Sequence, residues 1–287
     1  MKNTKKFKNL ILEKKILMMP CTHDSLSAKI AEKVGFKAIC VGGYGTSASM
    51  LGKPDIGLLT MTEIVENVSR ICDCVDIPVF ADADTGYGNT TNVNRTVRAL
   101  EKAGAAGLFI EDQTFPKRCG HMEGKDVCFR SEIVSKIKAA LDSRIDPDFI
   151  IMGRTDAIAT HGLDEAILRG CLMQEAGADM IFIEAPTSIE QMKKINTEIS
   201  APTFAVYLEG GKIPLLSAKQ FEDLGYNVLA YGASGLYASA FAIQKTFLEI
   251  MEKGETTNSI LNMIQFSDFN ELLDLSNIRK TESHFNL

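Results

Sequence analysis

Short apolar runs alternate along this chain with longer segments in which apolar residues recur every three or four positions. The first pattern is typical of buried strands and the second of amphipathic helices. We predict strands over residues 16–20, 37–43, 78–84, 107–112, 148–154, 180–184, 202–207 and 227–231. We predict helices over residues 25–34, 63–74, 92–103, 132–141, 164–175, 189–199, 217–224 and 236–252, with two short helices and a polar tail after residue 254.

The alternation of strands and helices predicts the fold class. It indicates a parallel sheet whose strands are joined by helical crossovers. Eight repeats within 287 residues favour a closed (β/α)8 barrel over an open doubly wound sheet. No linker or change in composition divides the chain, so we expect residues 1–287 to form one domain with a helical extension from about residue 254.

Composition limits the kinds of binding partner and the cellular compartment that we expect for this protein. A hydrophobic fraction of 45% and a net charge of −6 indicate a globular protein with no general attraction for nucleic acid. No apolar run approaches the roughly 18 residues of a membrane helix. Charged residues at 13–15 stop the N-terminal apolar run, unlike a signal peptide. Seven cysteines at irregular spacing, without a CxxC motif, indicate reduced thiols, so we expect a cytoplasmic protein. From the charge and the apolar runs we expect it to bind neither nucleic acid nor membrane.

Polar side chains gather where the predicted strands end. In a (β/α)8 barrel the carboxyl ends of the strands form the active-site face. The residues in these positions are Gly42, Gly43 and Tyr44 after strand two, Asp82 and Asp84 after strand three, Glu111 and Asp112 after strand four, Arg154 and Asp156 after strand five, and Glu184 after strand six. Their convergence on one rim indicates a functional site.

Three of these carboxylates predict a metal site. Asp82 and Asp84 lie two residues apart, on the same side of an extended chain. Together with Glu111 they offer hard oxygen ligands without histidine, which suits Mg²⁺ or Mn²⁺ better than zinc. Mg²⁺ keeps several waters, so we expect some of the contacts to be indirect. The alternative is a pair of aspartates that cap helices or form salt bridges.

The connection after strand four, residues 112–130, is long and carries the sequence Lys117-Arg118-Cys119-Gly120-His121. Loops of this length are often functional lids, and we expect this one to open without ligand and order with it. Neighbouring cations favour a thiolate and predict a lowered pKa for Cys119, which would serve as nucleophile or proton donor. The alternative is a solvated basic loop with an incidental cysteine. We interpret the other six cysteines as core or incidental residues.

The sequence Gly42-Gly43-Tyr44-Gly45 imitates part of a dinucleotide fingerprint. We reject that interpretation because glycine and proline within residues 49–60 argue against a helix opening there. Tyr44 is either a proton carrier or a packed loop aromatic. Arg154 suits carboxylate binding, and a salt bridge with Glu184 or Glu111 is its alternative role.

The pentapeptide at 117–121 resembles the signature of the isocitrate lyase/phosphoenolpyruvate mutase superfamily, in its carbon–carbon lyase branch. The resemblance extends from about residue 20 to about residue 252, and within the branch it is similar to 2-methylisocitrate lyases and 2,3-dimethylmalate lyases. It implies the same barrel, metal binding at Asp82, Asp84 and Glu111, and a homotetramer in which a C-terminal helix packs on a neighbouring subunit.

The resemblance also implies a reaction, the retro-Claisen cleavage of a 2-hydroxy dicarboxylate to pyruvate and a short carboxylic acid. Cys119 would protonate the carbanion, and Tyr44 or a metal-bound hydroxide would take the hydroxyl proton. Lys117, Arg118 and His121 would stabilise negative charge. The substrate contacts would come from Gly42, Gly43, Tyr44, Arg118, Gly120, His121, Arg154 and Glu184. Alternatives are a 2-methylisocitrate lyase, an oxaloacetate hydrolase, a phosphonate-forming mutase and a non-catalytic binding barrel.

Three positions depart from the tricarboxylate-cleaving relatives. Where 2-methylisocitrate lyases typically have Asn, Thr and Arg, alignment places Val206, Leu208 and Tyr237. Losing a charge-assisted partner costs on the order of 1.5–3 kcal/mol, so we expect a smaller, alkylated dicarboxylate such as 2,3-dimethylmalate. The segment 209–214 resembles the dimethylmalate lyase version of this loop, whereas Val206 replaces the Asn expected in that branch.

Overall fold

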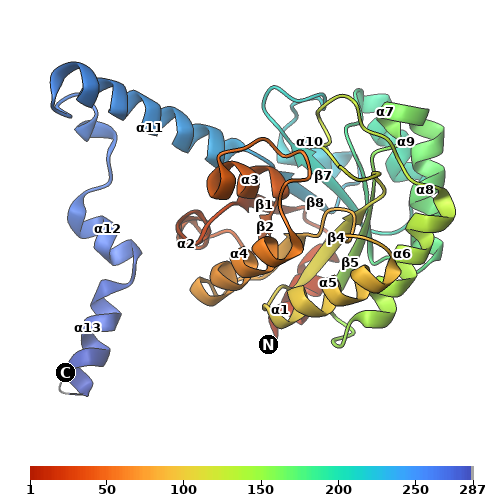
Figure 1. Ribbon diagram of the computed structural model, residues 1–287, viewed down its shortest axis with the longest axis horizontal. Coiled ribbons are helices and arrows are strands. Elements are labelled where there is room, and N and C mark those ends of the chain that lie inside the picture. The colour runs from red at the N-terminus through yellow and green to blue at the C-terminus, as the bar shows by residue number, and fades with distance from the viewer. Residues whose placement is uncertain (286–287) are drawn as a thin grey trace.

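A closed parallel barrel forms the body of the protein in the computed structural model, which describes residues 1–285 (Figure 1). The strands follow one another around the barrel in chain order, and β8 pairs with β1. They are β1 (Leu17–Thr22), β2 (Ile39–Val41), β3 (Val79–Asp82), β4 (Gly107–Glu111), β5 (Ile150–Thr155), β6 (Met180–Ile183), β7 (Thr203–Tyr207) and β8 (Val228–Tyr231). The predicted (β/α)8 barrel is confirmed.

The interior of the barrel is filled by every second residue of each strand, as the two-residue period of a strand requires. Aromatic rings dominate this layer: the Phe80 and Phe204 ring centroids are 6.2 Å apart, and those of Phe182 and Phe204 are 5.0 Å apart. Toward the carboxyl rim the same inward positions become polar, at Asp82, Arg154 and Glu184. The alternation that builds the core therefore also aims the polar side chains into the mouth of the barrel.

Helices cover the outside of the barrel. They are α2 (Ser25–Val34), α4 (Met61–Cys74), α5 (Thr90–Lys102), α6 (Arg130–Ser143), α8 (Leu163–Glu175), α9 (Ile189–Glu198), α10 (Ala218–Asp223) and α11 (Ser234–Lys253). Side-chain caps define where several of these helices begin. At the start of α2, for example, the Asp24 carboxylate accepts a hydrogen bond from the Ser27 amide at 2.7 Å. All eight predicted helices are present, with ends displaced by up to two residues.

Three helices were not predicted: α1 (Asn3–Ile11), α3 (Gly43–Leu51) and the single turn α7 (Ile158–His161). Helix α1 places Phe7 against Phe80, with ring centroids 5.2 Å apart, and so covers the end of the barrel opposite the polar rim. The expectation that no helix opens at the glycine turn was wrong. Gly52, in a left-handed conformation, ends α3 instead of preventing it.

The C-terminal part extends away from the barrel (Figure 1). Helix α11 leads outward, and the turn η1 (Ile260–Asn262) and the helices α12 (Phe266–Leu272) and α13 (Leu275–His284) follow. The exposed apolar side chains of α11 include Phe241 and Phe247. Within residues 1–285, no helix combines the length and apolar character needed to span a membrane.

Candidate active site

A cavity opens at the carboxyl ends of the strands. Nine of the residues predicted for the site line it: Gly42, Gly43, Tyr44, Asp82, Cys119, Gly120, His121, Arg154 and Glu184. Three others, Asp84, Glu111 and Lys117, are buried but do not line the cavity. Arg118 is exposed, and its guanidinium donates to the Glu123 carbonyl at 3.2 Å. We predicted that Arg118 contacts the substrate, but the structure does not place its guanidinium in the cavity.

The acidic residues form a buried group of oxygen atoms. Asp82 accepts from the Gly43 amide at 2.9 Å and the Asp84 amide at 2.8 Å. Asp84 Oδ1 lies 2.5 Å from Lys117 Nζ. Among the described residues, neither carboxylate oxygen of Glu111 finds a hydrogen-bond partner. Burial raises the pKa of Asp84 to about 6 and raises the pKa of Glu111 well above its ordinary value.

These oxygens fit a hydrated Mg²⁺ better than a bare ion. Within residues 1–285, no three His, Cys, Asp or Glu side chains are close enough to coordinate one metal directly. Mg²⁺ keeps several waters and needs only one or two direct carboxylates. Neither oxygen of Glu111 accepts a hydrogen bond from residues 1–285, and such waters would supply the missing donors. The structure therefore groups Asp82, Asp84 and Glu111 without making them a direct three-carboxylate ligand set.

Lys117 is held in this acidic group by a residue that the sequence analysis missed. Its ammonium lies 2.8 Å from Asp55 Oδ1, and the Asp55 carbonyl accepts from the Cys119 amide at 3.0 Å. Burial disfavours the charged lysine, but the surrounding carboxylates, Asp84 first, raise its pKa well above the ordinary value. Asp55 lies in the irregular segment after α3, where no motif marks it. It anchors the cysteine loop to the barrel.

The Cys119 thiol is protonated, contrary to the sequence-based prediction of a thiolate. Burial raises its pKa to about 11, outweighing the His121 backbone hydrogen bond that lowers it. The nearby cations do not compensate, because Lys117 is paired with Asp55 and Asp84 and Arg118 points to solvent. At neutral pH the side chain is a proton donor and not a ready nucleophile.

His121 is a neutral hydrogen-bonding residue. Its Nδ1 accepts from the Lys212 amide at 3.0 Å, which leaves the proton on Nε2, 3.4 Å from Glu184 Oε1. Burial is the main cause that lowers its pKa, so it contributes no full positive charge at pH 7. Gly120 is required beside it, because a Cβ there would lie 2.4 Å from the Glu184 carboxyl group.

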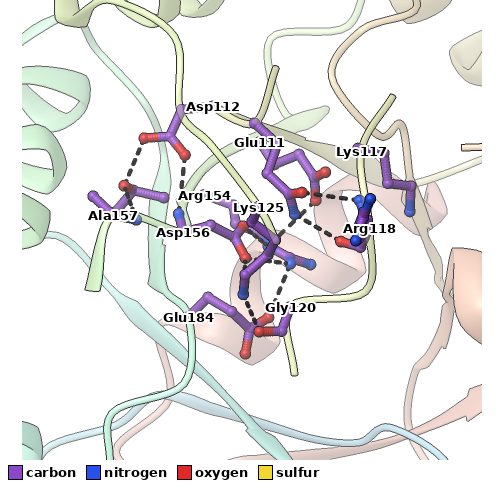
Figure 2. Close-up of polar contacts among 12 residues, drawn as sticks. Glu111, Asp112, Lys117, Arg118, Gly120, Lys125, Arg154, Asp156, Ala157 and Glu184 are labelled. Atoms are coloured by element: carbon purple, nitrogen blue, oxygen red, sulfur yellow. Dashed lines mark hydrogen bonds and ion pairs between the residues drawn. The ribbon is translucent and has the colours of Figure 1, made fainter. Parts of the chain in front are cut away.

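Arg154 is the centre of the network in Figure 2. Its Nε donates to Asp156 Oδ2 at 2.9 Å, and its Nη2 lies 3.1 Å from Glu184 Oε2. Glu111 Oε2 lies 3.4 Å from Nε. Both predicted salt-bridge partners are present, together with Asp156. Lys125 was also missed by the sequence analysis. Its Nζ donates to Asp156 Oδ1 at 3.0 Å and to the Gly120 carbonyl, so it connects the loop to the end of β5.

The glycine turn lines the cavity, and one of its backbone amides is already engaged. The Gly43 amide is already bonded to Asp82, so it is not free for a substrate carboxylate. This carboxylate also argues against a pyrophosphate at the same helix start. The amides of Tyr44 and Gly45 follow in the first turn of α3, where amides lack partners within the helix. The Tyr44 hydroxyl lies 3.1 Å from the Tyr237 hydroxyl.

The rest of the cavity wall is mostly apolar. It includes Phe109, Phe182, Phe204, Val206, Leu208, Cys21 and Cys40. Val206 and Leu208, selected from the sequence, therefore do face the cavity. Cys21 and Cys40, interpreted from the sequence as core or incidental residues, also line it, and they are register partners on β1 and β2.

Asp55→Asn should loosen the loop 112–130. Replacing the charged partner of Lys117 removes a charge-assisted bond, and we expect amide hydrogen exchange across residues 113–128 to accelerate about 10- to 100-fold. Asp76→Asn, at an exposed aspartate, is the matched control. Equal protection in wild type and Asp55→Asn would contradict the anchoring role.

The structure describes one conformation of this loop, and its opening without ligand stays a prediction.

The fold and the site define a (β/α)8 barrel enzyme with an acidic oxygen cluster, a buried lysine and a protonated thiol at one rim. The family model described as phosphoenolpyruvate phosphomutase matches residues 7–251. The chain belongs to the phosphoenolpyruvate mutase/isocitrate lyase superfamily.

Relatives include lyases and hydrolases. The chain is 46% identical to 2,3-dimethylmalate lyase of Eubacterium barkeri, covering 99% of both chains. It is 38% identical to 2-methylisocitrate lyase of Aeropyrum pernix, covering 96% of this chain and 89% of the relative.

Similar solved structures include two hydrolases. One is oxaloacetate acetylhydrolase in complex with 3,3-difluorooxalacetate, with a TM-score of 0.94 and 30% identity over 99% of this chain and 97% of that one. Another is phosphonopyruvate hydrolase in complex with oxalate and Mg²⁺, with a TM-score of 0.90 and 29% identity over the whole of both chains.

Proposed function

We propose that this protein is a Mg²⁺-dependent carbon–carbon lyase that cleaves an alkylated 2-hydroxy dicarboxylate to pyruvate and a short carboxylic acid. The observation that carries the proposal is that Cys119, Arg154 and Asp82 line one cavity, and burial, which raises the pKa of Cys119 to about 11, keeps the thiol in its acid form. A lyase of this kind needs an acid beside the nascent carbanion and fixed positive charge for the carboxylates. The likeness to 2,3-dimethylmalate lyase supports the same reaction.

Mg²⁺, held by Asp82, Asp84 and Glu111 directly or through water, would stabilise negative charge on the substrate oxygens. Lys117 keeps that acidic group together and partly neutral. Arg154 binds a substrate carboxylate through Nη1, since Nε and Nη2 are engaged by Asp156 and Glu184.

Two protons move during the reaction. Tyr44, acting in its phenolate form, takes the proton from the substrate hydroxyl and becomes the neutral phenol, and the C2–C3 bond breaks as the 2-oxo group forms. The electron pair remains on C3, next to its carboxylate, and Cys119 gives that carbon its proton. His121 and the Gly120 backbone hold the loop in place around the thiol.

Apolar walls at Val206 and Leu208 favour methyl groups over a third carboxylate. We therefore expect kcat/KM for 2,3-dimethylmalate to exceed that for 2-methylisocitrate and isocitrate by tenfold or more under one Mg²⁺ condition. Enzymatic detection of the keto acids measures all of these substrates. A preference for either tricarboxylate would contradict the small-pocket argument.

The serious alternative is an oxaloacetate hydrolase, favoured by the structural likeness to oxaloacetate acetylhydrolase. Oxaloacetate in the same panel separates the two, because hydrolysis releases oxalate and acetate without pyruvate. A 2-methylisocitrate lyase would release succinate with pyruvate. A phosphonate-forming mutase is disfavoured by the cysteine loop, and a binding barrel by the buried acid–lysine group.

We also propose a cytoplasmic homotetramer. The support is the outward course of α11 and its exposed Phe241 and Phe247, which a second copy of the chain would cover.

A further inference from the structure

The hydroxyl of Tyr237 has a partner inside the active site although Tyr237 does not itself line the cavity. Its oxygen lies 3.1 Å from the Tyr44 hydroxyl, and the two rings meet edge to face with centroids 6.2 Å apart. Tyr44 stands in the first turn of α3 and Tyr237 in the first turn of α11, so the bond joins two helices distant in sequence (Figure 1).

The start of α11 is fixed independently of this bond. The Ser234 hydroxyl donates to Glu209 Oε1 at 2.6 Å, and the Tyr237 amide donates to the Ala233 carbonyl at 2.8 Å. Tyr237 therefore offers its phenol from a rigid support, which is the arrangement that orients a partner group.

Either hydroxyl can donate in this hydrogen bond while both phenols carry their protons. Burial first, and the bond to Tyr44 next, raise the pKa of Tyr237 above its ordinary value. When Tyr44 has lost its proton as the base of the proposed reaction, the Tyr237 hydroxyl is the group that can donate, and the Tyr44 oxygen accepts. A donor aimed at a phenol oxygen favours the form of that phenol that has lost its proton.

We propose that Tyr237 is a positioning residue that orients Tyr44 and prepares its oxygen to take the substrate hydroxyl proton. This inference rests on the proposed lyase reaction. It also gives position 237 a role beyond size selection: a phenol here supplies a neutral donor to Tyr44 where an arginine would bring a charge.

Tyr237→Phe tests the role because it removes one hydroxyl and keeps the ring. We expect kcat on 2,3-dimethylmalate to fall about tenfold with KM changed less than about twofold. The acid limb of the kcat/KM profile should move to higher pH. Tyr44→Phe should cost more, and the double variant should be no slower than Tyr44→Phe alone, because Tyr237 acts through Tyr44. Additive losses would overturn the proposal, as would an unchanged kcat in Tyr237→Phe.

A spectroscopic measurement separates this inference from the proposed function. The chain has six Tyr and no Trp, so its near-ultraviolet spectrum reports the tyrosine hydroxyls. The changes caused by Tyr44→Phe and Tyr237→Phe should not sum to that of the double variant. Tyr231→Phe, at a residue whose hydroxyl donates to Met18 Sδ at 3.7 Å and not to Tyr44, should be additive with Tyr44→Phe and keep full activity. Coupled spectra in a protein that cleaves no dicarboxylate would reject the reaction and leave the contact standing, and additive spectra would reject the contact itself.

Discussion

Cys119→Ser should lower kcat by about 100- to 10,000-fold, the range expected when a general acid is lost. A serine hydroxyl is a much weaker acid than the thiol, although it has nearly the same shape. Binding of Mg²⁺ and pyruvate should persist, because the carboxylates and Arg154 are unchanged. Steady-state kinetics and calorimetric titration of both ligands measure the two effects.

The matched control is Cys171→Ser on α8, outside the cavity. It should retain wild-type turnover. A Cys119→Ser variant as fast as wild type would show that another group protonates the carbanion. Because burial raises the pKa of Cys119 to about 11, the acid form persists throughout the neutral range. A loss of activity between pH 7 and 9 that disappears in Cys119→Ser would contradict that assignment.

Removing divalent metal should reduce turnover to background, and Mg²⁺ or Mn²⁺ should restore it. Asp84→Asn should raise the Mg²⁺ concentration needed for half-maximal rate by about 10- to 100-fold, the usual effect of changing a group that holds a metal or its waters. The exposed Asp268→Asn on α12 is the control and should leave that concentration unchanged. Full activity in chelator would reject the metal role of the carboxylates.

Lowering the pH should weaken Mg²⁺ binding at the carboxylates. Burial raises the pKa of Asp84 to about 6, so protons compete with Mg²⁺ as the pH falls through that value. The Mg²⁺ requirement of the wild type should therefore rise below about pH 6 and level off above it. Rate measurements across Mg²⁺ concentrations at several pH values test this.

The barrel and its rim could be predicted because they depend on local patterns. Strand periodicity sets which residues face inward, and the carboxyl end of each strand places Asp82, Arg154 and Glu184 at one mouth. Helix α1 was missed because its first half is rich in lysine, although Phe7, Leu10 and Ile11 form a buried face. Helix α3 was missed because Gly52 was interpreted as a breaker within the segment, whereas it is the residue that ends the helix.

The electrostatics of the loop could not be predicted from sequence neighbours. Lys117 and Arg118 adjoin Cys119 in the chain, but Asp55, 62 residues away, pairs with the lysine, and the arginine faces solvent. Burial then decides the state of the thiol. The same reason hid the roles of Lys125 and Tyr237, since each depends on a partner that only the closed barrel brings near.

The most direct test of the proposed reaction is nuclear magnetic resonance of 2,3-dimethylmalate incubated with the protein and Mg²⁺ in deuterium oxide. The account predicts pyruvate and propionate in equal amounts, with a single deuterium at C2 of propionate, because one solvent-derived proton reaches the carbanion through Cys119. Unchanged 2,3-dimethylmalate, alongside conversion of oxaloacetate to oxalate and acetate, would contradict it.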